Sequence, residues 1–586
     1  MRNPTTAARC GPAAAALLAA AALSLALAAT AGAAPGALTQ KSGTAGCISE
    51  TGSAGACTDG TALDQASTVT ISPDGRNAYA ASAISGSVSI FDRNTTTGAL
   101  TQKPGTTGCI SDDGSGGACV DGTALAGAFA VTVSPDGRNV YAVAKDANAI
   151  AIFDRDPTTG ALTQKPGTAG CISNTGSAGA CVDGTALDGA FSVTVSPDGK
   201  SVYAASFFSS AVSIFDRDPN TGALTQKPGT AGCISDDGSG GACTDGTALT
   251  GAFGVTVAPD GGNVYATGQG ADAVTVFDRN TTTGALTQKP GTAGCISETG
   301  SAGACTDGTA LGGAFGVTVS PDGSNVYVPA QNADAVAIFD RNATTGALTQ
   351  KPGTAGCISE TGTSGACTDG TVLDGARTVA IAPDGSAAYA AAAVSDAITV
   401  FDRDVPPQTT LDSAPSGLIN DPTPTFTFSS DDPAASFQCS IDAGPFGSCS
   451  GPGAADTTAA LADGPHSFAV RAVDSASTPD PTPASRDFTV DATGPKTTIQ
   501  KGPKAKVKTK GKKAKVTVTF KSEAGAGFEC RLDKAQFKRC DSPFKAKVKS
   551  KPGKGAKHTI SIRATDGAGN VEGKPATVKF KVIRKE

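Results

Sequence analysis

The chain has 586 residues, enough for three or four domains, and contains 74 glycines, 34 prolines, one methionine and no tryptophan. Only 17% of its residues are charged and turn-forming residues are dense, which excludes a protein built of long helices and predicts many short strands. The net charge of −6 is unevenly spread, since residues 496–586 carry +19 and the remainder carries −25.

Residues 1–33 have the pattern of a secretory signal peptide. A basic start is followed by an Ala/Leu run from Ala13 to Ala29 and then by small residues. The run is short and Ala-rich for a transmembrane anchor, and Cys10 precedes it, which does not fit a lipoprotein. We therefore expect cleavage after Ala31 or Ala33, no transmembrane anchor, and a secreted, extracellular or cell-envelope location.

A unit of 62 residues recurs through the next part of the chain, and it begins at Cys47, Cys109, Cys171, Cys233, Cys295 and Cys357. A fixed period of this length is typical of solenoids, propellers and arrays. The unit from Cys109 contains four strand patterns: Ala128 to Ser134, Asn139 to Ala144, Ala149 to Arg155, and Ala161 to Lys165. The first three are apolar on both faces, as a propeller blade between two neighbours requires. A parallel β-helix or a row of separate sandwiches is the alternative.

The ends of the array predict how the ring closes. The sixth unit ends at Asp404 after its third strand, and Gly36 to Lys41 (GALTQK) supplies the missing fourth strand at the other end. Pairing of that segment into the last blade would remove the open edges. We predict an all-β chain, with a six-bladed β-propeller over residues 34–404.

Sixteen cysteines form eight Cys-x9-Cys pairs, a constant spacing that in an exported chain indicates local disulfides. Zinc is the alternative, but this is not a zinc spacing and the repeats contain no histidine. The predicted disulfides are Cys47 with Cys57, Cys109 with Cys119, Cys171 with Cys181, Cys233 with Cys243, Cys295 with Cys305, Cys357 with Cys367, Cys439 with Cys449, and Cys530 with Cys540.

The segment SPDGRNVYAVA followed by AIAIFDRDPTTGAL resembles the YVTN-type repeats of the lactonase-like β-propeller family, and the resemblance covers residues 36–404. That family includes sugar-lactone hydrolases, usually seven-bladed, and members that are repeat scaffolds. The resemblance implies a propeller fold, and it leaves open whether the chain is an enzyme.

Chain direction places all six disulfide loops and the variable second–third loops at one end of the ring, which we call the disulfide face. Near-invariant Pro-Asp-Gly and Thr-Gly turns occupy the other end. Because variable loops on a repeated scaffold carry function, we expect any site on the disulfide face.

One position breaks the repeat symmetry at the start of the innermost strand. Four units have phenylalanine there (Phe129, Phe191, Phe253 and Phe315), the first has Ser67 and the sixth has Arg377. In the family resembled, this position often holds a basic or histidine residue facing the central channel. The sequence thus predicts a pocket for an anion or sugar acid, unless blades six and one simply repack where the ring closes. Its candidate ligand-binding residues are Arg377, Ser67, Lys145, Asp146, Phe207, Phe208, Gln269 and Gln331.

No catalytic residue, metal site or cofactor is predicted. The two histidines, His466 and His558, lie outside the propeller, which excludes a histidine general base or metal site there. Asp112 and Asp113, with Asp121, suggest calcium, but turn-capping aspartates explain them better because no calcium-loop register is present.

Residues 405–495 and 496–586 read as two β-sandwiches and resemble bacterial immunoglobulin-like surface domains, each with one Cys-x9-Cys hairpin. In the second, lysine alternates with small or apolar residues at Lys513 to Lys521 and Phe544 to Lys549. A period of two puts these lysines on one face of a strand. That face favours an anionic wall polymer or glycan or anionic lipid headgroups. Nucleic acid is less favoured without Trp or Tyr to stack on bases, and a merely solubilising face remains the alternative.

We therefore expect a secreted or envelope-associated binding or scaffold protein: a propeller with an unidentified protein or carbohydrate ligand, immunoglobulin-like stalk domains, and a basic domain for retention. The first alternative is an exported lactonase-like hydrolase acting on a sugar lactone, and the second is an inert structural array.

Overall fold

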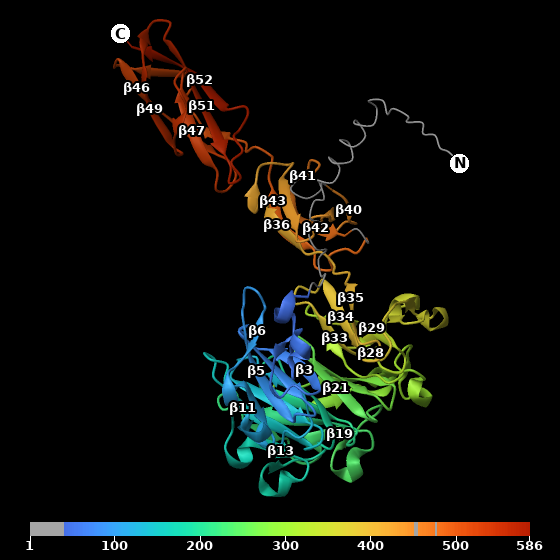
Figure 1. Ribbon diagram of the computed structural model, residues 1–586. Coiled ribbons are helices and arrows are strands. Elements are labelled where there is room, and N and C mark those ends of the chain that lie inside the picture. Colours follow the sequence, from blue (N-terminus) through green and yellow to red (C-terminus); the bar gives the residue numbers. More distant parts are fainter. Residues whose placement is uncertain (1–39, 450–454, 475–476, 586) are drawn as a thin grey trace, which may run out of the picture. The chain divides into compact units, whose positions relative to one another are not determined.

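The computed structural model describes residues 40–449, 455–474 and 477–585, which form β-strands joined by turns and short 3-10 helices (Figure 1). The chain separates into two compact units, one ending at Arg403 and the other beginning at Asp404. The first holds six repeated blade sheets and the second holds two β-sandwich modules. The predicted all-β class, a six-bladed propeller followed by immunoglobulin-like sandwiches, is confirmed. The expected signal peptide lies outside the described residues, and no helix within them is long and apolar enough to cross a membrane.

Blade two shows the plan of the repeat. Strands β9 (Ala128–Val133), β10 (Asn139–Ala144) and β11 (Ala149–Arg155) form an antiparallel sheet within one residue of the predicted bounds. The fourth position is divided between two short strands: β12 (Leu162–Gln164) pairs with the last three residues of β11, and β13 (Cys171–Ser173) pairs with the first three. The cysteine segment is therefore part of the blade edge.

The other blades repeat this order. Their first strands are β3 (Ala66–Ile71), β15 (Ala190–Val195), β21 (Ala252–Val257), β27 (Thr318–Val319) and β33 (Ala376–Ile381). Their second strands are β4 (Asn77–Ser82), β16 (Ser201–Ser206), β22 (Asn263–Gly268), β28 (Asn325–Ala330) and β34 (Ala387–Ala392). Their third strands are β5 (Ser87–Arg93), β17 (Ala211–Arg217), β23 (Ala273–Arg279), β29 (Ala335–Arg341) and β35 (Ala397–Asp402). Short edge strands β6 (Leu100–Gln102), β7 (Cys109–Ser111), β18 (Leu224–Gln226), β19 (Cys233–Ser235), β24 (Leu286–Gln288), β25 (Cys295–Ser297), β30 (Leu348–Gln350) and β31 (Cys357–Ser359) complete blades one and three to five.

The core lies between neighbouring blades, because both faces of the middle strands are apolar. Between blades one and two, Tyr79 and Ile90 pack with Val131, Val140 and Phe153, all of them buried. Equivalent clusters repeat between the later blades. Each blade therefore depends on its neighbours for burial, as in other repeat proteins.

A buried arginine also joins each of blades two to six to the preceding blade, and we call this contact the arginine latch. Arg217 of blade three donates to the Tyr141 hydroxyl at 2.7 Å, the Asn139 Oδ1 at 2.7 Å and the Asp136 Oδ2 at 2.8 Å, all in blade two. A fourth bond, of 2.8 Å, goes to the Gly199 carbonyl in its own blade. Arg155, Arg279, Arg341 and Arg403 make the same kind of contact.

The predicted disulfides are confirmed at all eight Cys-x9-Cys pairs. Six lie in the propeller and join Cys47 to Cys57, Cys109 to Cys119, Cys171 to Cys181, Cys233 to Cys243, Cys295 to Cys305, and Cys357 to Cys367. The other two lie one in each sandwich module and join Cys439 to Cys449 and Cys530 to Cys540. The zinc alternative is therefore wrong for these cysteines.

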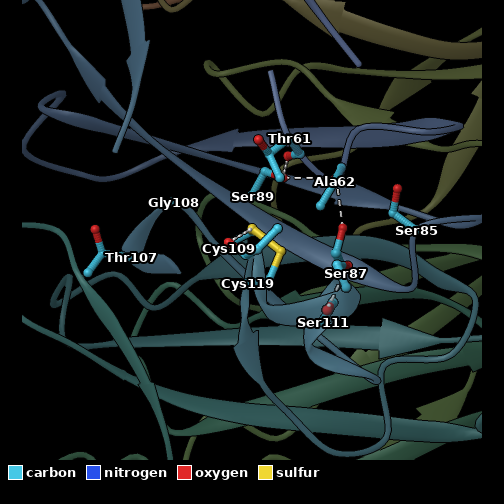
Figure 2. The surroundings of a disulfide bond; sticks show 12 residues. Thr61, Ala62, Ser85, Ser87, Ser89, Thr107, Gly108, Cys109, Ser111 and Cys119 are labelled. Carbon is cyan, nitrogen blue, oxygen red and sulfur yellow. Dashed lines mark hydrogen bonds between the residues drawn. A yellow bond between two sulfur atoms is a disulfide. The ribbon is translucent and has the colours of Figure 1, made fainter. Parts of the chain in front are cut away.

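The propeller disulfides from Cys109 onward lie at the edge of a blade sheet and pack against the loop that enters the same blade. Figure 2 shows the Cys109–Cys119 bond, which packs against Ala62 at the entrance to blade one. The Ala62 carbonyl accepts hydrogen bonds from the hydroxyls of Ser87 at 2.8 Å and Ser89 at 2.9 Å. The disulfides that begin at Cys171, Cys233, Cys295 and Cys357 pack in the same way against the entrance alanine of the preceding unit. Each such disulfide therefore supports the entrance loop of the blade at whose edge it lies.

The predicted closing strand lies outside the described residues except for Gln40 and Lys41, which belong to no strand. Within the described part of the chain, β1 (Ile48–Ser49) pairs with β2 (Thr58–Asp59), and β35 pairs with β34. Closure of blade six by the first segment stays a prediction.

The faces of blades one and six at this seam are more exposed than their counterparts. Val69 of blade one is 63% exposed and Ile398 of blade six is 62% exposed. The corresponding Val131 and Ile150 in blade two are 7% and 0% exposed. The seam thus offers an apolar face on each side.

The sandwich modules share one sheet plan. In module one, sheet β36-β38-β41 faces sheet β37-β43-β42-β39-β40, and in module two, sheet β44-β46-β49 faces sheet β45-β52-β51-β47-β48. Their cores are Phe-rich and Val/Ile-rich, respectively. Module one comprises β36 (Thr409–Ser413), β37 (Gly417–Ile419), β38 (Thr425–Ser430), β39 (Ser436–Ile441), β40 (Gly447–Ser448), β41 (Ala455–Thr457), β42 (Gly464–Val473) and β43 (Ala484–Val490). Module two comprises β44 (Thr498–Lys501), β45 (Lys506–Thr509), β46 (Lys513–Lys521), β47 (Gly527–Leu532), β48 (Lys538–Arg539), β49 (Phe544–Lys549), β50 (Lys551–Pro552), β51 (Ala556–Thr565) and β52 (Ala576–Arg584).

Candidate ligand site in the propeller

The second–third loops and the loops that enter each blade lie at the same end of the propeller. The Lys145 amide donates to the Gly127 carbonyl at 3.1 Å, and the Gly189 amide donates to the Asn148 Oδ1 at 2.7 Å. These bonds tie the variable loops to the entrance loops that the disulfides support. The structure therefore has the disulfide face that chain direction implied.

A cavity of 610 Å³ opens among the innermost strands of all six blades. Its lining includes all six residues at the position where the repeats differ: Ser67, Phe129, Phe191, Phe253, Phe315 and Arg377. This volume is within the range of small-molecule sites. The repeat position chosen from the sequence does face a common space.

Four phenylalanine rings form one wall of this cavity. The centroids of Phe191 and Phe253 are 4.5 Å apart, and those of Phe253 and Phe315 are 3.7 Å apart. Phe129 contacts Phe191 edge-on at 4.8 Å. The rings pack on one another, so they supply a fixed apolar surface against which the body of a ligand can lie.

The charged groups of the described lining are both cationic. Arg377 is exposed, its guanidinium carbon lies 5.5 Å from the Phe315 ring centroid, and it makes no ion pair among the described residues. Lys145 is half-buried and pairs with Asp146 at 2.8 Å. Arg377 is therefore the less neutralised of the two cations, and the cavity favours an anionic group beside an apolar wall.

The other predicted ligand residues lie around this cavity and do not line it. Phe207 is half-buried and approaches Phe191 at 6.0 Å, while Phe208 is 69% exposed beside it. The backbone amides of Gln269 and Gln331 hold their loops to the entrance loops at 3.0 Å. The binding role of the whole predicted set stays a prediction.

Five polar lining residues were missed by sequence reasoning: Gln65, Thr68, Ser192, Thr318 and Thr378. Gln65 and Thr378 lie beside Ser67 and Arg377, respectively, in the cavity wall. Both flank the symmetry-breaking position closely, so adjacency was the signal that would have found them. Blades one and six thus contribute five of the eight polar lining residues, while Lys145, Ser192 and Thr318 come from blades two, three and five.

No Asp, Glu or His side chain lines the described cavity. Asp113 has the predicted turn role, since it accepts from the Ser115 amide two residues further on at 2.8 Å. Asp112 instead accepts from the more distant Leu125 amide at 2.8 Å and ties the disulfide loop to the entrance of blade two. No cluster of three or more His, Cys, Asp or Glu side chains suited to a metal occurs in the described ranges.

Both histidines serve the sandwich modules in the same way. His466 contacts Asp442 at 2.8 Å and His558 contacts Asp533 at 2.8 Å, and in each case the aspartate also accepts a backbone amide. Hydrogen bonding with the Ala462 carbonyl and with Asp442 raises the pKa of His466. These contacts join strands within each sandwich module.

The family described as "Lactonase, 7-bladed beta-propeller" matches residues 68–170. A putative 6-phosphogluconolactonase from Bacteroides fragilis is a similar solved structure, with 20% identity over 58% of this chain and 81% of that one and a TM-score of 0.40. The periplasmic gluconolactonase of Pseudomonas aeruginosa has 17% identity over 58% and 81%, with a TM-score of 0.38. Fibronectin(III)-like modules of Clostridium thermocellum CbhA have 18% identity over 30% and 95%, with a TM-score of 0.20.

No curated protein sequence matches the chain. Its eight disulfides indicate an extracytoplasmic protein. The resemblance to the lactonase-like propellers is confirmed, and the family match that carries it covers residues 68–170.

Proposed function

We propose that the propeller binds a small organic anion of the sugar-acid type at the cavity on its disulfide face. The observation that carries this proposal is the lining itself: its two charged residues, Arg377 and Lys145, are cationic and stand beside a wall of four phenylalanines. A carboxylate or phosphate would meet Arg377, and the apolar face of a ring would lie on the aromatic wall.

The names of the similar proteins suggest the probes, gluconate and 6-phosphogluconate. Either compound should raise the melting temperature of the native protein in proportion to the logarithm of its concentration. Arg377→Met should weaken binding about tenfold or more, the loss expected for one charge-assisted hydrogen bond. Arg138→Met, an exposed arginine on the opposite turn face, is the matched control. Equal binding by the native protein and the Arg377 variant would refute the proposal.

The second candidate is an exported lactonase-like hydrolase, which the family match over residues 68–170 favours. Ring opening of a lactone needs a group that activates water, and the described cavity lining offers no carboxylate or imidazole for this. We therefore favour binding over catalysis. Acid release from glucono-δ-lactone above the spontaneous rate, abolished by Arg377→Met, would reverse that preference.

The two sandwich modules then serve as a stalk, and module two retains the secreted protein on anionic material of the envelope. Its net charge of +19 supports this part of the proposal. Association with the envelope fraction should fall as salt rises, because exposed charges are screened within about 10 Å at 0.1 M salt. Partition that does not depend on salt would contradict retention by charge.

A further inference from the structure

One face of module two carries lysines directly opposite one another. Strands β46 and β49 pair with Lys513 opposite Lys549, Lys515 opposite Lys547, and Thr517 opposite Lys545. We call Lys513, Lys515, Lys545, Lys547 and Lys549 the lysine ladder. All five side chains are exposed, while the alternating Ala514, Val516, Val518 and Val548 are buried.

The ladder is not neutralised by the protein. In the described part of module two, the ion pairs are Arg563 with Glu529 and His558 with Asp533. Neither includes a ladder lysine, although the His558 imidazole also lies 2.7 Å from the Lys549 backbone carbonyl. Two further acidic side chains are buried and hydrogen-bonded within the module: Glu572 accepts from Thr497, and Asp566 accepts from the Asn570 amide. Like charges directly opposite each other destabilise a strand pair, so the ladder costs the module stability.

The fold does not require these lysines. Module one has the same three-stranded sheet and no lysine at all. Its strand β38 has the sequence TFTFSS where β46 ends in TVTFK, and Thr425 pairs with Thr457 as Thr517 pairs with Lys545. The two Lys–Lys pairs lie in an extension of β46 and β49 beyond the length that module one has.

We propose that the lysine ladder is the binding site for a linear polymer of phosphate groups, a ligand class that deepens the retention role proposed above and rests on it. Lysines two residues apart on one strand are spaced by about 6.7 Å, and paired strands lie about 4.8 Å apart, which gives a double row of positive charge. An extended polyanion lying along these rows removes the repulsion that the free module carries. Affinity therefore comes from charges the fold has left unpaired.

The composition of the ladder selects phosphate. Lysine is a compact point charge that binds phosphate without fixed geometry, whereas arginine is preferred where a planar carboxylate is held by two bonds. The four arginines of module two, Arg531, Arg539, Arg563 and Arg584, all lie on strands of the other sheet. No Trp or Tyr occurs in the module to stack on nucleic-acid bases. The outer ladder positions also present no large apolar group for insertion into a bilayer.

The test compares two full-length variants with equal charge. The ladder variant carries Lys513→Gln, Lys515→Gln, Lys547→Gln and Lys549→Gln. The control variant carries Lys508→Gln, Lys538→Gln, Lys551→Gln and Lys579→Gln, four exposed lysines on strands of the other sheet that are opposite no lysine. It leaves intact the row in which Lys506 and Lys557 lie opposite Lys581 on that sheet. Binding is measured by titration with long-chain inorganic polyphosphate, with polygalacturonate and phosphatidylglycerol vesicles as comparison probes.

We expect the native chain to prefer polyphosphate to polygalacturonate and vesicles. The ladder variant should lose at least about tenfold in affinity and show a shallower dependence of log K on log salt, by about three. In the control variant, log K for polyphosphate should fall by less than a third of the decrease seen in the ladder variant. The ladder variant alone should also melt at a higher temperature than the native chain in low salt, because cross-strand repulsion is removed.

Equal losses in both variants would show diffuse charge in place of a site, and preference for the vesicles or polygalacturonate would refute the phosphate assignment. The retention role fails separately. If the ladder variant loses polyphosphate binding but still partitions into the envelope fraction like the native chain, the phosphate site is supported and the retention role is refuted.

Discussion

Replacing Arg217 with methionine should destabilise the propeller by about 3 kcal/mol. Its side chain is 1% exposed and donates four hydrogen bonds, three of them across the boundary of blades two and three and one to the Gly199 carbonyl in its own blade. Asp136 keeps 33% of its side chain exposed and stays hydrated, so losing that ion pair costs roughly 1 kcal/mol. The Asn139 Oδ1 and the Gly199 carbonyl lose a buried donor, at about 1 kcal/mol each. The Tyr141 hydroxyl keeps its bond to the Gly222 carbonyl at 2.8 Å.

Arg93→Met is the matched control, because Arg93 occupies the same repeat position but makes one side-chain hydrogen bond in the described structure, to the Gly75 carbonyl at 3.0 Å. It should cost less than about 1 kcal/mol. The assay is urea unfolding under oxidising conditions, read as the shift in midpoint at constant slope. A loss below about 1 kcal/mol for Arg217→Met would refute the latch argument. If Arg93→Met instead lowers the free energy of unfolding as much as Arg217→Met does, then Arg93 of blade one engages Asp384 and Tyr389 of blade six, as the predicted ring closure requires.

Three other perturbations test contacts of the same kind. Replacing Cys171 and Cys181 with serine should lower the free energy of unfolding by about 2–3 kcal/mol, measured by denaturation against the native protein with and without reductant; an unchanged midpoint would show that this loop adds nothing. Burial raises the pKa of Tyr141 to about 12 and, although burial opposes it, hydrogen bonds from Ser72, the Arg76 amide and Arg155 lower the pKa of Asp74 to about 2. Tyr141 therefore stabilises the fold below about pH 10 and loses this contribution as pH rises toward 12. Asp74 contributes stability above about pH 4 and loses it as pH falls toward 2. Tyrosinate absorbance that rises near pH 10 in the folded protein would contradict the expectation for Tyr141. Gly222→Ala should cost over about 2 kcal/mol, since a Cβ there would lie 2.1 Å from Asn139 at a φ of +70°. Gly229→Ala, at a φ of +59° with open space around it, should cost only about 1 kcal/mol, and equal melting temperatures for the two would rule out the clash.

Strand positions were largely predictable because alternation and turn residues are local signals. The bounds of β10 and β11 match the prediction at both ends, and those of β9 differ by one residue. The fourth strand was only half predicted. Its second piece, β13, contains Cys171, and the sequence interpretation placed that cysteine in a connecting loop. A three-residue strand has too few residues to show alternation.

The arginine latch was not predicted, although all its residues were visible. Arg217 and Asp136 are 81 residues apart, so their contact crosses a repeat boundary and depends on how blades stack. Asp136 belongs to a Pro-Asp-Gly turn, where it accepts from the Arg138 amide at 3.1 Å through one oxygen. Its other oxygen binds the next blade. The available signal was an arginine at the end of an otherwise apolar strand in every unit, a residue that is rarely buried unless paired.

The candidate site lies where the repeats cease to be alike. Blades two to five each contribute a phenylalanine to the cavity wall, and these four similar side chains make a uniformly apolar surface. Ser67 and Arg377, from the first and last blades, give that surface a polar side with one cation that makes no described ion pair. These two blades also border the seam, where Val69 and Ile398 are exposed while their counterparts in blade two are buried. Selection for packing is therefore weakest where the polar substitutions occur, so a nearly uniform array can acquire an asymmetric pocket without disturbing its interior interfaces.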